Sequence, residues 1–289
     1  MKWQRFLIET PKRLAPAPSK ELWEQTPTGY FIMTKTMAPA KRLVAQQIYD
    51  MVTRDHPGAM NATEFELQVF LNVVHDLQSK HVNLFELGAG RGDWCLALAG
   101  VVDFGLIPTT AESYKCLTIE IDPTHYLWTT QHLKSQKING SVVHGAAWHH
   151  DGCVGYKPTT DPAVHYGQHA TEIEYDGPPD FEKGLLPCFT IDTLMAKFGF
   201  DHVDIIHLDV QGSEGRVLAA SKQVCGAGGV DYIIVGTHHP HMNKLIRDLL
   251  ATRYDILVDL PLQSRLRQTP IGKVYLHGDG VMLLKRKGL

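Results

Sequence analysis

Short apolar segments alternate with amphipathic segments along most of the chain. Apolar runs bounded by turn residues predict buried strands, and apolar positions that recur every three or four residues predict helices packed on them. Regular alternation of the two predicts an α/β fold with a mainly parallel sheet covered by helices on both faces. We expect strands at residues 83–87, 116–121, 141–147, 203–208, 232–236, 254–260 and 280–284.

The helical segments fit between these strands. We expect helices after the first two strands and over residues 214–220 and 242–251. Another helix precedes the first strand, because the apolar residues from Phe65 to Leu77 share one face. Thr63 and Glu66 have the spacing of a capping box at its start. The main domain is therefore assigned to residues 61–289.

Residues 1–60 have a different composition, with six prolines. A helix is expected only over residues 40–54, where apolar residues form a stripe. We interpret the segment as an extension that packs on the main domain, as a lid or as an arm in a homo-oligomer, or as a partly ordered leader. Residues 151–188 and 261–279 also break the alternation, and each is expected to be either a long functional loop or a β-hairpin.

The composition excludes several classes of protein. The net charge is −3, with 28 basic and 31 acidic residues, so no basic excess predicts a nucleic-acid partner. Five cysteines without a C-x-x-C pair predict no zinc ribbon and no disulfide framework, and favour a reducing compartment. No signal peptide and no apolar run long enough to span a membrane is recognisable, so a cytoplasmic location is expected.

A run of alternate glycines follows the strand expected at residues 83–87. Gly88, Gly90 and Gly92 build a turn, Glu86 precedes it, and a helix start follows. Glycine has no Cβ, so a ligand can lie against the backbone, and the helix start offers free N–H groups. This order of strand, glycine turn and helix predicts a site for a nucleotide-like cofactor.

The spacing of the turn discriminates among such cofactors. A P-loop ends in Gly-Lys-Ser/Thr, but Gly92 is followed by Asp93. The dinucleotide fingerprint G-x-G-x-x-G would place its third glycine at position 93, where Asp93 again stands. An acid at Glu86 is unfavourable beside a pyrophosphate and favourable beside an ammonium group. S-adenosylmethionine carries such a group, and we expect it as the cofactor.

A second acidic residue is expected at the end of the next strand, where carboxylates bind ribose hydroxyls. Glu120 and Asp122 alternate on one side of that strand end. Glu120 is the first choice, because Asp122 precedes Pro123 and is also typical of a turn.

Residues 86–92 and 119–123 together resemble the motifs of class I S-adenosylmethionine-dependent methyltransferases. Two more segments, residues 190–194 and 203–218, resemble the FkbM type, whose pattern is T-x-D-x-L followed by K-x-D-V-E-G-x-E. The resemblance covers about residues 80–240. It implies a Rossmann-like class I methyltransferase fold with a mainly parallel seven-stranded sheet. It also implies O-methylation of a hydroxyl on a glycan or other small-molecule secondary metabolite.

The resemblance also implies which residues touch the cofactor. Trp148 follows the third strand, near where an adenine ring would lie, although Trp94 and Trp128 are alternatives and large aromatic residues are commonly core residues. The residues expected to bind S-adenosylmethionine are Glu86, Gly88, Ala89, Gly90, Gly92, Glu120, Asp122, Ala147, Trp148 and Asp209.

The acceptor is expected beyond the ends of the strands at residues 203–208 and 232–236, because ligands of open parallel sheets bind there. Asp209, His238 and His239 are the catalytic candidates, with a histidine as base and Asp209 orienting it or the acceptor hydroxyl. The same three residues could bind a divalent metal ion as an alternative.

Two residues beside this centre depart from the family pattern. His207 stands where lysine is usual, and Gln211 stands where glutamate is usual. The loss of a carboxylate at position 211 removes one base or metal ligand. These departures leave open a methyltransferase fold that serves as a non-catalytic binding module. An NAD-dependent oxidoreductase is a separate alternative, which Asp93 in place of the third glycine disfavours.

Overall fold

A computed structural model describes most of the chain. The described residues are 1–4, 23–25, 31–33, 60–105, 107–157, 167–226, 229–262, 265–276 and 279–289. The helix expected over residues 40–54 lies outside them. Gln4 of the first segment exchanges two hydrogen bonds with Asn72, so the start of the chain lies against helix α2 (Ala62–Asp76).

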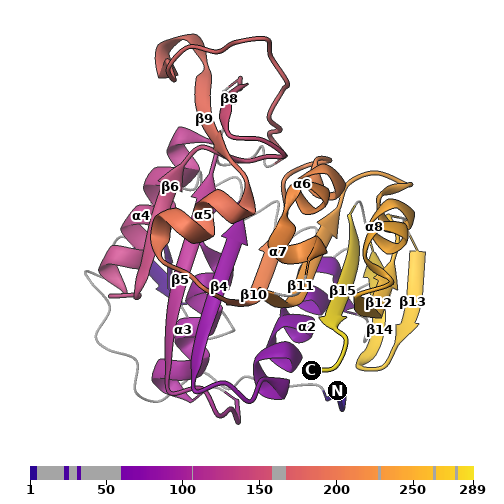
Figure 1. Ribbon diagram of the computed structural model, residues 1–289. Helices are drawn as coiled ribbons and strands as arrows, with labels where there is room; N and C mark the ends of the chain where they lie inside the picture. Colours follow the sequence, from indigo (N-terminus) through magenta and orange to yellow (C-terminus); the bar gives the residue numbers. More distant parts are fainter. Residues whose placement is uncertain are drawn as a thin grey trace.

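A seven-stranded sheet forms the centre of the molecule (Figure 1). Its strand order is β12-β15-β11-β10-β4-β5-β6, and only β15 runs antiparallel to its neighbours. This confirms the expected Rossmann-like α/β fold with a mainly parallel seven-stranded sheet. The strands are β4 (His81–Leu87), β5 (Ser113–Glu120), β6 (Gly140–His144), β10 (Val203–Leu208), β11 (Val230–Thr237), β12 (Tyr254–Leu260) and β15 (Gly280–Arg286).

The strand order reverses between β4 and β10. The chain passes outward from β4 through β5 to β6, then returns to β10 on the other side of β4 and continues to β11. Neighbouring loops diverge at such a switch point and leave a crevice beyond the carboxyl ends of the strands. The glycine turn after β4 and Asp209 after β10 therefore lie at the position where open α/β sheets bind ligands.

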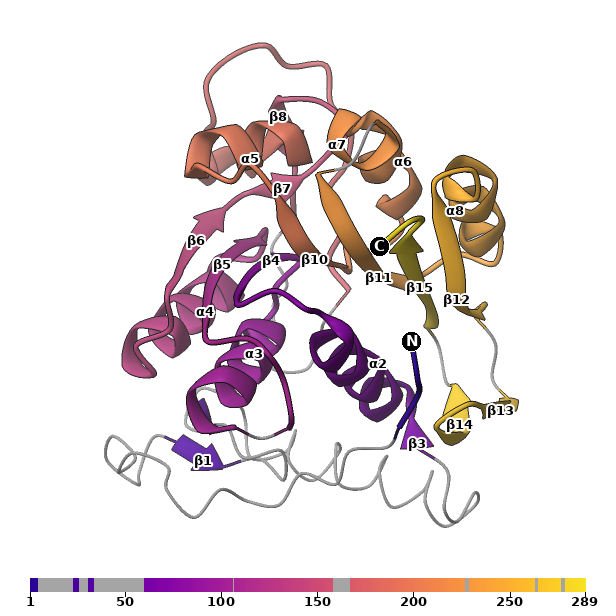
Figure 2. The same cartoon turned by 60° about the horizontal axis from the view of Figure 1, so that its bottom comes forward.

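Helices cover both faces of the sheet (Figure 2). Alternate strand residues pack on opposite faces: Leu84 and Ile205 belong to one core, and Phe85 and Ile206 to the other. Helices α2, α3 (Asp93–Phe104) and α4 (Pro123–Ser135) lie on the first face. The second face carries α5 (Ile191–Phe198), α6 (Glu214–Ala220), α7 (Lys222–Cys225) and α8 (Met242–Leu250).

The two irregular segments contain strands. Residues 261–279 form a hairpin of β13 (Arg265–Thr269) and β14 (Gly272–Leu276), which adds β3 (Met60–Asn61) in parallel. In the segment at 151–188, a strand near the start pairs antiparallel with a strand near the end, and the pair projects beyond the sheet in Figure 1. Its elements are β8 (Gly152–Gly155), η1 (Phe181–Lys183) and β9 (Leu185–Phe189), with β7 (Ala146–Ala147) beside β9. A third pair joins β1 (Trp23–Gln25) and β2 (Phe31–Met33).

The capping box predicted at the start of α2 is wrong. The helix begins at Ala62, so Thr63 lies within it rather than before it. Glu66 instead contacts His207 of β10 across the face of the sheet. Helix α5 was not expected from the sequence; Thr190 caps it by accepting the N–H of Thr193.

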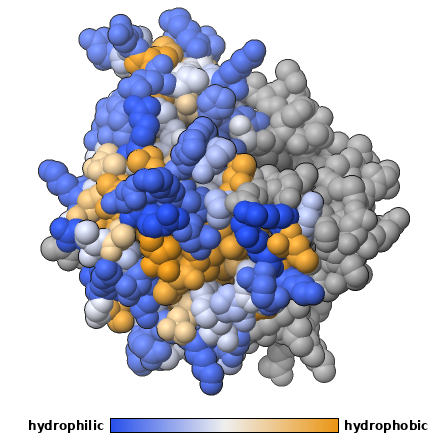
Figure 3. Space-filling model, turned by 90° about the vertical axis from the view of Figure 1, so that its right-hand side faces the viewer, coloured by the Kyte–Doolittle hydropathy of each residue, from blue (hydrophilic) through white to orange (hydrophobic). Residues whose placement is uncertain are grey.

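Strands β12 and β13 are edge strands on the side of the molecule that Figure 3 shows. Apolar surface lies there among hydrophilic residues, and Leu245 of α8 and Leu266 of β13 are about half exposed. The register of β12 shifts between Ile256 and Val258. A bulge of this kind disrupts the row of backbone groups along an edge and opposes pairing with another chain.

Candidate functional site

The glycine turn is held between two strand ends. Gly88, Gly90 and Gly92 all have positive φ, at 84°, 56° and 77°. The N–H groups of Gly88 and Ala89 both donate to the carbonyl of Ile119 in β5. On the other side, a Cβ on Gly88 would lie 1.7 Å from the backbone oxygen of Asp209. Only glycine therefore fits at position 88, because φ is positive there and because a Cβ would overlap the backbone at the end of β10.

Glu86 is fully buried beneath this turn. Its two carboxylate oxygens accept the N–H groups of Trp94 and Cys95, each at 3.1 Å, at the start of α3. Burial raises the pKa of Glu86 to about 7, and these hydrogen bonds oppose the rise. Glu86 thus fixes the turn against the helix that follows. The contact of Glu86 with a cofactor ammonium stays a prediction.

Glu120 connects the turn to the end of β5. The N–H of Gly90 donates to Glu120 Oε2 at 2.6 Å, and the N–H of Asp122 donates to Oε1 at 2.8 Å. Burial raises the pKa of Glu120 to about 7. Each carboxylate oxygen keeps a further lone pair, so the group can still accept hydroxyl donors.

Asp122 caps helix α4. Its Oδ1 accepts the N–H groups of Thr124 and His125, and its Oδ2 accepts the hydroxyl of Tyr156 at 2.5 Å. The turn-forming interpretation of Asp122 is confirmed, and its role in cofactor binding stays a prediction. Helix α4 also holds the turn from outside, where Thr129 and His132 donate to the carbonyls of Gly90 and Arg91.

Ala147 and Trp148 lie beyond β6, in the small sheet of β7, β8 and β9. Both are buried, and the N–H of Trp148 donates to Phe189 of β9. The guanidinium carbon of Arg216 lies 5.5 Å from the centre of the Trp148 ring. The indole Nε1 is buried and has no hydrogen-bond partner among the described residues. Among the other tryptophans, Trp94 stacks on His207, with ring centres 4.2 Å apart, and Trp128 is buried beside His125.

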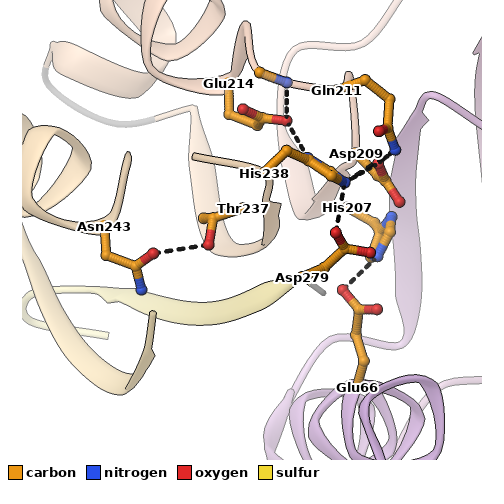
Figure 4. Close-up of polar contacts among 10 residues, drawn as sticks. Glu66, His207, Asp209, Gln211, Glu214, Thr237, His238, Asn243 and Asp279 are labelled. Carbon is orange, nitrogen blue, oxygen red and sulfur yellow. Dashed lines mark hydrogen bonds and ion pairs between the residues drawn. The ribbon is translucent and has the colours of Figure 1, made fainter. Parts of the chain in front are cut away.

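Asp209 lies directly after β10, and its side chain keeps 36% of its surface exposed (Figure 4). Gln211 Nε2 donates to Asp209 Oδ1 at 2.8 Å, and His238 Nε2 lies 3.2 Å from the same oxygen. The bare Cα of Gly236 at the end of β11 leaves room beside Asp209 Oδ2. Desolvation raises the pKa of Asp209 to about 6, although the charge of His238 opposes the rise. A carboxylate with such a pKa could serve as a general base near neutral pH.

His238 is surrounded by acidic groups. Its Nδ1 donates to Glu214 Oε1 at 2.8 Å, and its Nε2 lies 3.6 Å from Asp279 Oδ1. Burial alone would lower the pKa of His238, but the hydrogen bond with Glu214 and the charges of Asp209, Glu214 and Asp279 raise it to about 9. These acids favour the cationic imidazole. Gln211 Nε2 also lies 2.9 Å from His238 Nε2, so this nitrogen faces both the Gln211 amide and Asp209. Its position suits it to hold Asp209 rather than to act as the base.

A strained loop connects Asp209 to helix α6. Gln211 has φ of 57°, a left-handed conformation that is uncommon for a residue with a side chain, and Gly212 follows with φ of 104°. The N–H of Gly212 donates to Glu214 Oε1, and Glu214 Oε2 is buried with no hydrogen-bond partner in the described part of the chain. Strain of this kind commonly marks sites where a side chain must be held in one orientation. Here it directs the Gln211 amide toward Asp209 and His238.

His239 does not join this cluster. It is exposed, and its ring contacts that of His241 at 5.5 Å. Within the described residues, three potential metal ligands converge at His149, His150 and Glu172 and at His202, Asp204 and Asp231. Asp209, His238 and His239 do not form such a group. A metal ion at these three residues thus gains no support from their geometry.

His207 and Glu66 form a buried pair below Asp209. His207 Nε2 lies 3.1 Å from Glu66 Oε1, and within the described residues its buried Nδ1 has no hydrogen-bond partner. Burial would lower the pKa of His207, but the adjacent Glu66 carboxylate outweighs it and raises the pKa. The pair connects α2 to β10, so it supports the strand end that carries Asp209.

Comparisons with known proteins give distant likenesses. No model of a protein family matches the chain, and no curated protein matches it. The METTL16 methyltransferase domain is 10% identical, with 92% of this chain and 86% of that chain covered and a TM-score of 0.47. Precorrin 8W decarboxylase from Methanobacterium thermoautotrophicum is 15% identical, with 79% and 92% covered and a TM-score of 0.43. TrmK of M. capricolum, in complex with S-adenosyl-homocysteine, is 7% identical, with 77% and 68% covered and a TM-score of 0.39.

The function must therefore be argued from the site itself. Sequence reasoning brought together Gly88, Gly90, Glu120, Asp209 and His238, which the structure places at the carboxyl ends of the neighbouring strands β5, β4, β10 and β11. It missed Glu214 as the partner of His238, because the two residues are 24 positions apart. The described residues include no helix that is both long and apolar enough to cross a membrane.

Proposed function

We propose that the chain is an S-adenosylmethionine-dependent methyltransferase that methylates a hydroxyl on a glycan or secondary metabolite. The observation that carries the proposal is the hydrogen bond from Gly90 to Glu120, which joins the glycine turn to a buried acid on the neighbouring strand. It brings a backbone open to close approach and an acceptor for ribose hydroxyls to one crevice at the switch point of the sheet.

The residues present fit such a cofactor. Glu120 has lone pairs left for two hydroxyl donors, and its end of β5 adjoins the turn. Glu86, buried beneath the turn, holds the start of α3 in place by accepting two of its N–H groups. The cofactor supplies an electrophilic methyl group on a cationic sulfonium. Of the remaining residues, Ala147 and Trp148 would contact the adenine end, and Asp209 would contact the methionine end.

Asp209 would accept the proton of the acceptor hydroxyl. No described donor is hydrogen-bonded to its Oδ2, whereas Oδ1 is held by Gln211 and His238. The raised pKa of Asp209 brings it close to neutral pH, where a carboxylate is effective as a general base. His238, kept cationic by Glu214, would fix Asp209 and stabilise its ionised form.

The start of α3 disfavours the alternative of an NAD-dependent oxidoreductase. Asp93 is the first residue of that helix, and its carboxylate pairs with Arg91. A carboxylate at this position would repel a pyrophosphate bound at the helix N-terminus.

The proposal is tested by transfer of a labelled methyl group. Purified protein would be incubated with methyl-tritiated S-adenosylmethionine and a cell extract, with excess S-adenosylhomocysteine as a competitor in a parallel sample. We expect label in a low-molecular-weight or glycan fraction, and its loss with the competitor. Cofactor binding without transfer to any fraction would instead support a binding module, and binding of NADH in place of S-adenosylhomocysteine would support an oxidoreductase.

A further inference from the structure

A second cluster lies at the opposite end of the sheet from the proposed active site. Asp204 of β10 and Asp231 of β11 are neighbours, because Val203 pairs with Val230 and Ile205 with Tyr232. Both carboxylates are buried, with only 4% and 6% of each residue exposed. In Figure 1 the strand starts that carry them lie away from the projecting pair of β8 and β9. Two like charges side by side in a buried position are unfavourable without a cation between them.

His202 supplies a nitrogen that faces both acids. Its Nε2 lies 3.0 Å from Asp231 Oδ2 and 4.0 Å from Asp204 Oδ1. The three ligand atoms lie within 4.8 Å of one another. Tetrahedral Zn²⁺ with nitrogen and oxygen ligands places neighbouring ligand atoms about 3.3 Å apart. The observed spacings bracket this value, so small side-chain movements suffice to close the site.

The other oxygen of Asp204 accepts a hydrogen bond, and the other oxygen of Asp231 forms an ion pair. Asp204 Oδ2 accepts the N–H of Asn83 at 2.7 Å, and Asp231 Oδ1 pairs with Arg286 Nη2 at 2.7 Å. Asn83 and Arg286 belong to the flanking strands β4 and β15, so four adjacent strands contribute to the cluster. Metal-binding carboxylates are commonly oriented by such outer partners.

Asp204 Oδ1 faces the histidine of the cluster. His202 Nε2 lies 4.0 Å from it. The Asp204 side chain is only 6% exposed. An oxygen in this position, which faces a histidine nitrogen and a second acid, is placed to coordinate a cation bound among the three residues.

We propose that His202, Asp204 and Asp231 bind a divalent transition-metal ion, with Zn²⁺ preferred. An imidazole nitrogen with two carboxylate oxygens suits Zn²⁺ better than Mg²⁺, which prefers oxygen ligands in an octahedral arrangement. The ion would join β10 to β11 at their starts. Because this end of the sheet lies opposite the glycine turn, the ion would stabilise the fold rather than take part in methyl transfer.

The other cluster of potential ligands provides a control. His149, His150 and Glu172 also converge, but Arg216 Nη2 lies 2.9 Å from His149 Nε2 and 2.7 Å from Glu172 Oε2. The Arg216 guanidinium thus contacts two of these three residues, whereas at the proposed site Arg286 pairs with Asp231. A His149→Ala variant therefore removes a histidine from a similar group without touching the proposed site.

The test is a titration of the chelator-treated full-length protein with CoCl₂, followed by displacement with ZnCl₂. We expect one equivalent of Co²⁺ to give a visible absorption spectrum without thiolate bands, and Zn²⁺ to abolish it. His202→Ala should weaken binding at least about tenfold and remove the rise in Tm that Zn²⁺ gives the wild type. His149→Ala should bind as the wild type does.

His202 is partly exposed, so its substitution leaves the core packing intact, and His202→Gln offers a second variant with a similar volume. Far-UV circular dichroism establishes that each variant is folded. The proposal is overturned by a wild type that shows no saturable Co²⁺ spectrum, by unchanged affinity in both His202 variants, or by loss of binding in His149→Ala.

Discussion

The Gly90 N–H donates to Glu120 Oε2 at 2.6 Å, across the ends of two adjacent parallel strands. This bond makes the glycine turn and the acid after it parts of one structure. Burial holds the pKa of Glu120 near 7, so the carboxylate changes charge within the physiological range. Hydroxyl donors from a ribose would favour its ionised form, which connects cofactor affinity to pH.

Gly88→Ala is expected to lower stability far more than Gly105→Ala. Both glycines have positive φ, at 84° and 64°, but only at position 88 would the new Cβ meet backbone, 1.7 Å from Asp209 O. Nothing lies within 4 Å of the Cβ position at Gly105. We expect a loss of about 1 kcal/mol for Gly105→Ala and of about 3 kcal/mol or more for Gly88→Ala, measured by urea unfolding. Equal losses would contradict the close contact of the turn with β10.

Asp209→Asn is expected to remove methyl transfer while S-adenosylhomocysteine still binds. The amide keeps the shape of the side chain but cannot accept a proton, and loss of a general base lowers rates by about 10²- to 10⁴-fold. The labelled-transfer assay measures the first effect and calorimetry the second. His239→Ala, at an exposed histidine outside the cluster, serves as the control and should retain activity. Full activity in Asp209→Asn would exclude Asp209 as the base.

The imidazole of His238 is expected to titrate near pH 9, and Glu214→Gln is expected to lower that pKa. The hydrogen bond from Nδ1 to the buried Glu214 carboxylate is the largest of the effects that raise it. NMR of histidine ring carbons against pH measures the value directly, with His239 as an exposed reference. A His238 pKa near 6.5 in the wild type would return this histidine to the role of base.

The folded protein is expected to lose stability as pH rises from 5 to 8, in part through Glu86. The pKa of Glu86 rises from an ordinary 4.5 to about 7 on folding, because burial disfavours its charge. A raised pKa means that the folded state binds the proton more tightly. Its contribution is therefore complete below about pH 4.5 and is lost as pH rises through 7.

The size of this effect is about 3 kcal/mol for Glu86 alone. Urea unfolding at pH 5 and pH 8 measures it, and Glu86→Gln, which cannot ionise, should show a flatter dependence. Glu120, Asp209 and His238 also have raised pKa values and act in the same direction. Identical pH dependence in the wild type and Glu86→Gln would show that Glu86 does not titrate in this range.

Much of the fold could be predicted from local pattern. Strands β10 and β12 and helix α6 have the bounds expected from the sequence, because each is a short apolar or amphipathic run with turn residues at its ends. Helix α5 was missed because Thr190 to Leu194 was interpreted only as a motif. The apolar spacing of Ile191, Leu194 and Met195, all buried, was the available signal.

The site was predictable only where a motif carried it. Glycines and acids at strand ends are local signals, and the parallel sheet brings them together. The pairs Glu66–His207 and Glu214–His238 are separated by 141 and 24 residues, and no local pattern connects their members. The charge of His238 could not be predicted for the same reason, since it depends on acids from three separate segments.

The central claim is that the turn and Glu120 bind S-adenosylmethionine. Its most direct test is isothermal titration of S-adenosylhomocysteine at pH 8 into the wild type and Glu120→Ala, with circular dichroism to verify that both are folded. We expect one equivalent to bind the wild type and the variant to bind at least about tenfold more weakly, because the ribose loses its acceptor. Absence of binding to the wild type, or equal affinity in the folded variant, would contradict the claim.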